Sequence, residues 1–123
     1  MIIGIGIDIV EIKRMERWIG DPKLLKRYFH NDELLSAVQN KTSISQTLAA
    51  RFAAKEAFGK ALGTGLTQIS LKDIMIFNNE NGKPEIKLFG TALAAFEKSG
   101  AAKIHVSLSH EKENAVCLII LEE

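Results

Sequence analysis

Isoleucine alternates with small or acidic residues near the start of the chain, and this alternation predicts a β-strand over residues 2–10. Successive side chains of a strand point to opposite faces. The isoleucines of one face are Ile3, Ile5, Ile7 and Ile9. The other face carries Gly4, Gly6 and Asp8. Because apolar residues dominate the run, we expect this strand to be buried.

Apolar residues at intervals of three and four predict helices in the first half of the chain. These segments are residues 11–19, residues 22–28, a helix that begins after Asn31, and a long helix that ends at Leu62. Thr42 or Ser43 is the expected cap at the start of the long helix. The sequence Gly63-Thr64-Gly65 is expected to end it.

The second half of the chain is richer in strand patterns. Predicted strands cover residues 70–77, 85–88, 103–109 and 115–121, and a short helix covers residues 91–98. The turns lie at residues 78–84 and 110–114. This order predicts an α+β fold in which an antiparallel sheet packs against one long central helix, as a single domain over residues 1–123.

Composition narrows the functional classes. The chain has 16 basic and 15 acidic residues, and it has no stripe of alternating aromatic and basic residues, so we expect no nucleic-acid partner. No apolar run approaches the length of a membrane span, so we expect no membrane partner. Cys117 is the only cysteine and lies in an apolar run, which favours a buried thiol and a cytoplasmic location.

Charged residues occur where the pattern of the long helix predicts burial. Ala49, Ala53, Glu56 and Lys60 follow one another at spacings of four, three and four, which places them in one narrow stripe. The small alanines allow another backbone to come close. We therefore expect the glycine face of the first strand to pack against these two alanines.

This packing would bring Asp8 and Glu56 together in a partly buried site. Two neighbouring carboxylates repel each other until a proton or a cation intervenes. Mg²⁺ accepts one or two carboxylates and completes its octahedron with waters and substrate phosphates. Lys60, one turn beyond Glu56, would meet such a phosphate, and the backbone N–H groups of Gly63 and Gly65 would also approach an anion. The residues alone thus indicate a magnesium and phosphate site.

Each of these residues also has an ordinary structural explanation. Asp8 is well placed to cap the helix that begins near residue 11. Glu56 and Lys60 have the spacing of a salt bridge on an exposed helix face.

Three sequence motifs resemble those of the holo-acyl-carrier-protein synthase family, the short bacterial type within the 4′-phosphopantetheinyl transferase superfamily. The first is Gly4-Ile5-Gly6-Ile7-Asp8-Ile9-Val10-Glu11-Ile12, followed by Arg14. The second is Arg51-Phe52-Ala53-Ala54-Lys55-Glu56-Ala57-Phe58-Gly59-Lys60-Ala61, which runs into Gly63-Thr64-Gly65. The third is Ser107-Leu108-Ser109-His110. The first two motifs together are highly specific, and the three span nearly the whole chain in the family's order.

The resemblance implies an enzyme that transfers 4′-phosphopantetheine from coenzyme A to a serine of an apo-acyl carrier protein. It implies release of adenosine 3′,5′-bisphosphate and a role in fatty acid biosynthesis. The family's Mg²⁺ ligands match Asp8 and Glu56, and its phosphate-binding lysine matches Lys60. The base that takes the serine proton is then a metal-bound water or a water held by Glu56.

The resemblance also implies a homotrimer with active sites between subunits. Arg51 lies away from the stripe of Glu56 and Lys60, so it would serve a neighbouring subunit's site at the 3′-phosphate, or else be a surface arginine. His105, Ser107 and His110 are candidates for nucleotide contacts across the interface. Pro84, in a predicted hairpin turn, is a candidate for contact with the adenine.

A basic patch on the first helix is the candidate site for docking of the carrier protein. Acyl carrier proteins are acidic, and Arg14 and Arg17 lie directly after the strand that carries Asp8. Arg14 matches the family motif, whereas Lys13 fits a solvated helix face.

Two other functional classes compete with the transferase. A non-catalytic module that binds coenzyme A would need no metal-binding pair, so the presence of both Asp8 and Glu56 disfavours it. A structural trimer protein with a polar core would show neither magnesium dependence nor affinity for coenzyme A.

Overall fold

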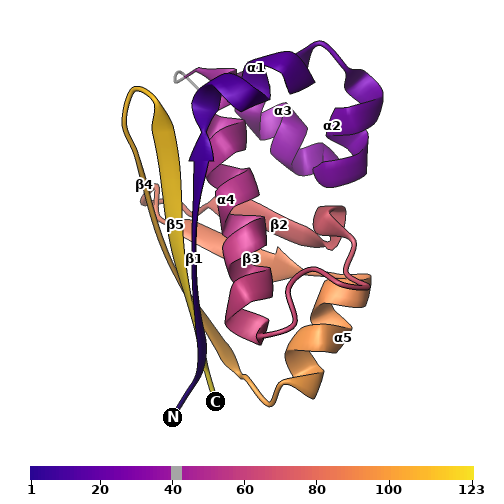
Figure 1. Ribbon diagram of the computed structural model, residues 1–123, viewed down its shortest axis with the longest axis vertical. Coiled ribbons are helices and arrows are strands. Elements are labelled where there is room, and N and C mark those ends of the chain that lie inside the picture. The colour runs from indigo at the N-terminus through magenta and orange to yellow at the C-terminus, as the bar shows by residue number, and fades with distance from the viewer. Residues whose placement is uncertain (40–42) are drawn as a thin grey trace.

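The computed structural model describes residues 1–39 and 43–123. Its elements, in chain order, are β1 (Ile2–Glu11), α1 (Ile12–Ile19), α2 (Pro22–Tyr28), α3 (Asn31–Gln39), α4 (Ile44–Leu62), the 3₁₀ helix η1 (Leu71–Asp73), β2 (Ile74–Asn78), β3 (Pro84–Leu88), α5 (Gly90–Lys98), β4 (Lys103–His110) and β5 (Asn114–Glu122). The strands form an antiparallel three-stranded sheet in the order β1-β5-β4 and a separate β2-β3 hairpin. The predicted α+β class is confirmed (Figure 1).

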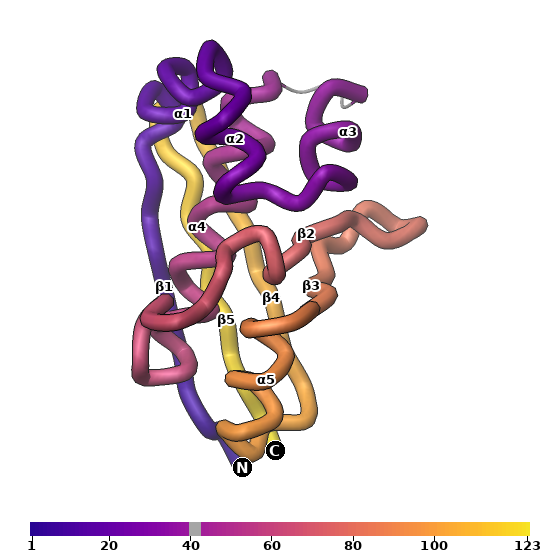
Figure 2. Tube along the Cα trace, turned by 90° about the vertical axis from the view of Figure 1, so that its right-hand side faces the viewer, coloured from indigo at the N-terminus to yellow at the C-terminus, as the bar shows by residue number. Residues whose placement is uncertain are grey.

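The long helix α4 is the centre of the molecule and packs on one face of the three-stranded sheet (Figure 1). Helices α1, α2 and α3 gather at one end of the sheet, and α5 lies toward the other end, where both termini also lie (Figure 2). Ser43 caps α4 by accepting a hydrogen bond from the Gln46 N–H, as predicted for one of the two candidates. The other candidate, Thr42, lies outside the described residues.

The glycine face of β1 lies directly against the backbone of α4. A Cβ atom added at Gly4 would lie 1.9 Å from the Ala61 carbonyl oxygen. One added at Gly6 would lie 1.9 Å from the Ala57 carbonyl oxygen. The close strand–helix approach is therefore as predicted, but the helix residues are Ala57 and Ala61 rather than Ala49 and Ala53. Ala57 and Ala61 lie nearer the carboxyl end of α4, where β1 crosses the helix.

The opposite face of the three-stranded sheet is open. Ile3, Ile5, Ile7 and Ile9 are 38%, 58%, 57% and 64% exposed. The prediction that this strand is buried is wrong for its isoleucine face in the single chain, because α4 covers the glycine face and none of the described elements covers the isoleucine face. The apolar pattern predicts burial of the whole strand, but within one chain only its glycine face is buried.

One predicted strand is shorter than expected. Residues 71–73 form the 3₁₀ helix η1, with Ser70 as its cap, instead of the start of β2. The Asp73 carboxylate accepts hydrogen bonds from the backbone N–H and the hydroxyl of Thr91, at 2.9 and 2.7 Å. This contact joins η1 to the start of α5, so the chain bends before it enters the hairpin.

Candidate active site

Asp8 and Lys60 meet where β1 crosses the end of α4. The Lys60 ammonium donates a hydrogen bond to Asp8 Oδ1 at 2.9 Å and another to the Ile7 carbonyl oxygen at 2.9 Å. The Asp8 side chain is 18% exposed, whereas that of Lys60 is 54% exposed and open to a ligand. The Asp8 carboxylate is therefore bound to a residue of α4. The alternative that it caps α1 is wrong, since the cap position of α1 is Glu11 and has no side-chain cap bond.

Glu56 belongs to the same group of charges. Its pKa is raised from the usual 4.5, first because burial penalises the carboxylate and then because the Asp8 charge repels it. The charges of Arg14 and Lys60 partly offset this rise. The structure therefore brings together Asp8, Glu56 and Lys60, the three residues that the sequence proposed for the catalytic centre.

The two carboxylates of Asp8 and Glu56 suit a metal ion that prefers oxygen ligands and takes most of them from water or substrate. Among the described residues, no group of three or more His, Cys, Asp or Glu side chains is placed to hold a metal ion. The Asp8–Glu56 pair provides carboxylate oxygens from two elements, and repulsion by the Asp8 charge adds to the effect of burial in raising the pKa of Glu56. Mg²⁺, which needs few protein ligands and keeps waters or phosphates, fits this pair.

Arg14 borders the acidic pair on the side of α1. Its guanidinium lies over the rings of Phe52 and Trp18, at 5.1 and 5.4 Å from their centroids. Arg14 and Arg17 also line a hollow of about 430 Å³ with Lys13 and two glutamates. The predicted basic patch therefore lies next to the carboxylate pair.

Gly63 and Gly65 end α4 rather than offer free donors. Both have positive φ values, 81° and 67°, which glycine adopts without strain. The Gly63 N–H donates to the Lys60 carbonyl oxygen at 3.0 Å, and the Gly65 N–H donates to the Gly59 carbonyl oxygen at 3.0 Å. Both N–H groups are used in closing the helix. The prediction that they approach an anion is wrong.

A second hollow lies on the far side of α4. It has a volume of about 350 Å³ and is lined by residues of α4, the β2-β3 hairpin and β4: Thr47, Ala50, Arg51, Ile76, Asn78, Gly82, Pro84, Leu108 and His110. Arg51, Pro84 and His110, which the sequence proposed for nucleotide binding, thus line one hollow. Arg51 is only 3% exposed, so the alternative of a surface arginine is wrong.

The other two nucleotide candidates lie apart from this hollow. His105 lines a neighbouring hollow of about 540 Å³, which also includes Pro84. Its Nε2 atom lies 3.0 Å from Glu122 Oε1, and this hydrogen bond is the main reason that the pKa of Glu122 lies below its usual range. Ser107 is exposed and pairs with Leu118 on the open face of the sheet.

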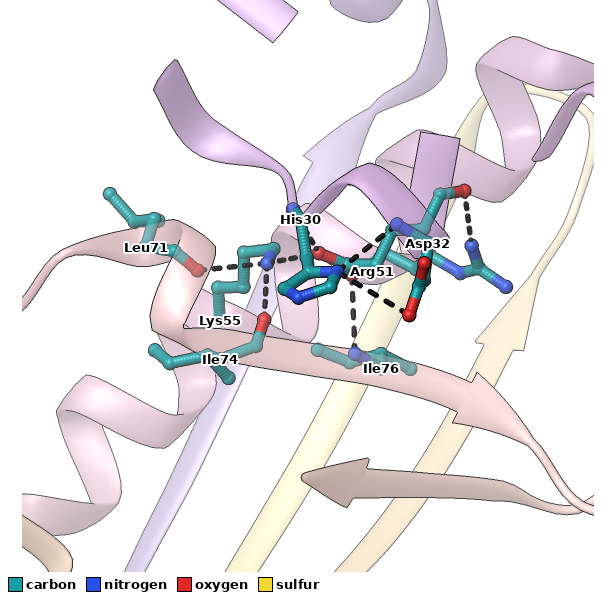
Figure 3. Close-up of polar contacts among 8 residues, drawn as sticks. His30, Asp32, Arg51, Lys55, Leu71, Ile74 and Ile76 are labelled. Carbon is teal, nitrogen blue, oxygen red and sulfur yellow. Dashed lines mark hydrogen bonds and ion pairs between the residues drawn. The ribbon is translucent and has the colours of Figure 1, made fainter. Parts of the chain in front are cut away.

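A buried ion pair that sequence analysis missed lies beside Arg51. Lys55 and Glu33 are 0% and 1% exposed, and their charged atoms are 2.6 Å apart. The Lys55 ammonium also donates to the carbonyl oxygens of Leu71 and Ile74 (Figure 3). All three of its N–H bonds are therefore used. Although Lys55 lies within the second motif, it is structural and is not available to a substrate.

The signal for this pair in the sequence was weak. Glu33 occupies the third position of α3, and its carboxylate accepts the His30 N–H at 2.9 Å, as in a capping box. The usual capping box begins with serine or threonine, whereas here the cap is His30, whose Nδ1 accepts the Asp32 N–H at 3.0 Å.

Comparison with known proteins identifies the family of this chain. Residues 4–119 match the family model described as the 4′-phosphopantetheinyl transferase superfamily. This chain belongs to the 4′-phosphopantetheinyl transferase superfamily. The family predicted from the three motifs is confirmed.

Individual relatives match this superfamily member over nearly its whole length. The holo-[acyl-carrier-protein] synthase of Treponema denticola is 53% identical, over 99% of this chain and 99% of the relative. The crystal structure of the holo-[acyl-carrier-protein] synthase from Neisseria meningitidis has a TM-score of 0.88 and 37% identity, over 100% of both chains. That of the Bacillus anthracis synthase, in complex with CoA (3′,5′-ADP), has a TM-score of 0.82 and 38% identity, over 99% of this chain and 97% of the other.

The described part of this transferase-family chain contains no helix both long and apolar enough to span a membrane.

Proposed function

We propose that this protein is a holo-acyl-carrier-protein synthase, which transfers 4′-phosphopantetheine from coenzyme A to a serine of an apo-acyl carrier protein. The reaction releases adenosine 3′,5′-bisphosphate and supports fatty acid biosynthesis. The observation that carries this proposal is the meeting of Asp8, Glu56 and Lys60 at the crossing of β1 and α4. The printed names of full-length relatives point to the same activity.

Asp8 and Glu56 are the proposed ligands of a Mg²⁺ ion, together with oxygens of the coenzyme A pyrophosphate. When bound, the ion neutralises the charge that builds up on the pyrophosphate as it is split. Lys60 is proposed to donate to the same phosphates, because its half-exposed ammonium now neutralises Asp8 and can turn to a stronger anion.

The serine of the carrier must lose a proton as it attacks. We propose that a water held by the Glu56 carboxylate receives that proton and passes it to the carboxylate. Arg14, which faces Glu56 from α1, and Arg17 are proposed to bind the acidic carrier, so that its serine comes to the carboxylate pair.

The nucleotide contacts are proposed to come from a second copy of the chain. Asp8 lies on β1, and His110 lies on β4, at opposite edges of the three-stranded sheet. The hollow that Arg51, Pro84 and His110 line is therefore separated from Asp8 within one chain by β5 and α4. His105 and Ser107, which lie on strand β4, would take part in the same contact between copies.

The open isoleucine face is the proposed interface of a homotrimer. Together with Val116, Leu118 and Ile120 of β5, the β1 isoleucines form an apolar sheet surface. A surface of this kind on a chain of ordinary composition marks a protein contact. With three copies around one axis, each shared site would lie between two neighbours.

Ile7→Glu is expected to convert the trimer to a monomer and to abolish transfer, because it places a charge in the middle of the apolar face. Light scattering after gel filtration measures the mass, and circular dichroism checks that the subunit stays folded. The matched control is Leu35→Glu, since Leu35 is 63% exposed on α3, away from this sheet. A variant Ile7→Glu with the mass of the parent would refute the interface.

A direct assay tests the proposed reaction. Apo-carrier protein, coenzyme A and Mg²⁺ are incubated with the protein, and mass spectrometry follows the phosphopantetheine adduct on the carrier. We expect the adduct to form only when all three components are present. If the carrier mass stays unchanged under these conditions, the proposed activity is wrong.

The cytoplasm is the proposed location. The one cysteine, Cys117, is buried between sheet and helix, and its pKa is raised to about 12, first by burial and then by the Asp8 charge. A chain without disulfides fits a reducing compartment.

A further inference from the structure

The ion pair of Glu33 and Lys55 joins three elements at the back of the hollow lined by Arg51. Glu33 belongs to α3 and Lys55 belongs to α4. Lys55 also binds the carbonyl groups of Leu71, at the start of η1, and of Ile74, at the start of β2 (Figure 3). The second carboxylate oxygen of Glu33 accepts the Ile76 N–H at 3.2 Å. One carboxylate thus binds both the long helix and the first strand of the hairpin.

Glu33 is also in contact with the arginine itself. The Arg51 guanidinium donates to the Glu33 carbonyl oxygen at 2.7 Å and to the Ser36 hydroxyl at 3.1 Å. These two bonds hold the side chain against α3. Because Arg51 also lines the hollow, and these two bonds use only two of its five N–H groups, its guanidinium can donate further hydrogen bonds to a ligand there.

We propose that Glu33, together with Lys55, is a positioning residue for the nucleotide half of coenzyme A. The Glu33 carboxylate fixes the backbone of β2 and ties α3 to α4. Because the main-chain carbonyl of Glu33 binds the Arg51 guanidinium, holding α3 in place also holds the arginine, and the two walls of the hollow keep a set distance. This inference rests on the proposed function of that hollow. Neither Glu33 nor Lys55 touches the substrate.

A positioning role explains the contacts of the Glu33–Lys55 pair better than a role in packing alone. A buried ion pair is seldom more stabilising than an apolar pair of the same volume. Here, however, the partners of the pair are the backbone groups of one hollow wall and the arginine of the other. Within the described residues, no buried side-chain nitrogen or oxygen lacks a hydrogen-bond partner, so the network is complete without any ligand. It is ready before the substrate arrives, as a positioning device must be.

The test measures binding rather than turnover. The double variant E33Q/K55M removes both charges and so avoids leaving one of them buried without a partner. Calorimetry on the full chain gives the Kd for coenzyme A, for adenosine 3′,5′-bisphosphate and for the apo-carrier protein. We expect the first two Kd values to rise about tenfold, as for loss of a residue that orients a ligand-binding group, while the carrier Kd is unchanged.

An Arg51→Met background shows whether the effect passes through the arginine. E33Q/K55M keeps the main-chain carbonyl of residue 33, so the ion pair can act on Arg51 only by holding α3 in place. If it does so, E33Q/K55M should change the coenzyme A Kd less than about twofold in the Arg51→Met background. Ala92→Gly in α5 is the control for lost stability, because Ala92 is fully buried and lies outside the hollow. It should leave all three Kd values unchanged.

The results separate this inference from the proposed reaction. An unchanged coenzyme A Kd in E33Q/K55M, an equal rise in the Arg51→Met background, or an equal rise in Ala92→Gly would each overturn the inference. A parent protein that binds coenzyme A but modifies no carrier would refute the proposed reaction only. A parent that does not bind coenzyme A at all would overturn both.

Discussion

Glu56→Gln is expected to lower the rate of transfer by on the order of a thousandfold, the scale of losing one charge-stabilising group in an active site. The same change is expected to raise the Tm of the protein in the absence of Mg²⁺. The pKa of Glu56 in the folded protein lies above its usual 4.5, because burial and the Asp8 charge oppose ionisation. The folded state therefore loses stability as the pH rises through that pKa, and a glutamine avoids this loss.

The pH dependence of the Tm difference checks the sign. At about pH 7 the variant should melt above the parent, and at about pH 3 the two should converge, since the carboxyl is then protonated in both folded and unfolded chains. Adding Mg²⁺ and coenzyme A should raise the Tm of the parent much more than that of the variant. Glu97→Gln, an exposed change on α5, is the control. Parent-like turnover by Glu56→Gln would show that the proposed metal pair is wrong.

Gly6→Ala is expected to destabilise the protein by about 3 kcal/mol or more, at the upper end of overpacking in a core. The added Cβ would lie 1.9 Å from the Ala57 carbonyl oxygen and 2.6 Å from the Ala61 nitrogen. Both atoms belong to the backbone of α4, so relief requires the whole helix to move off the sheet. Urea unfolding, followed by the fluorescence of the single Trp18, measures the change.

Gly20→Ala is the matched control for this substitution. Gly20 has φ −78° in the right-handed helical region, and a Cβ added there would lie 3.9 Å from the nearest atom. Its unfolding midpoint should remain close to that of the parent. If Gly6→Ala were as stable as Gly20→Ala, the strand would not lie against the helix as described.

The sequence predicted the fold well where each segment has its own local signal. The long helix has a capping serine and terminal glycines, and β1 has two glycines whose only plausible use was close packing. The meeting of Asp8 with Glu56 could be predicted from these features because the glycines mark the face of β1 that can approach a helix, and Glu56 lies in the same stripe of α4 as small alanines. Which alanines the strand would cross could not, since Ala49, Ala53, Ala57 and Ala61 all repeat at nearly the same helical spacing.

Other features depend on contacts that a sequence pattern does not record. The isoleucines of β1 signal burial without saying whether the covering surface belongs to the same chain. Glu33 and Lys55 are distant in sequence, and charged residues are expected at the surface, so their burial depends on a partner that only the folded chain reveals. Glycines at a helix end also occur where backbone N–H groups bind an anion, and this is why Gly63 and Gly65 were predicted to do so. In the structure their N–H groups are used in ending α4.

The pairing of β1 with β5 has a consequence for how the chain folds. Residues 2–11 lie beside residues 114–122, so the central contact of the sheet joins segments that are far apart in the sequence. Closing so long a loop is slow compared with forming local structure. The helix α4 can form early from local contacts, but its apolar surface stays uncovered until β1 and β5 pair and pack against it. We therefore expect the closure of this sheet, rather than the formation of α4, to limit the rate of folding.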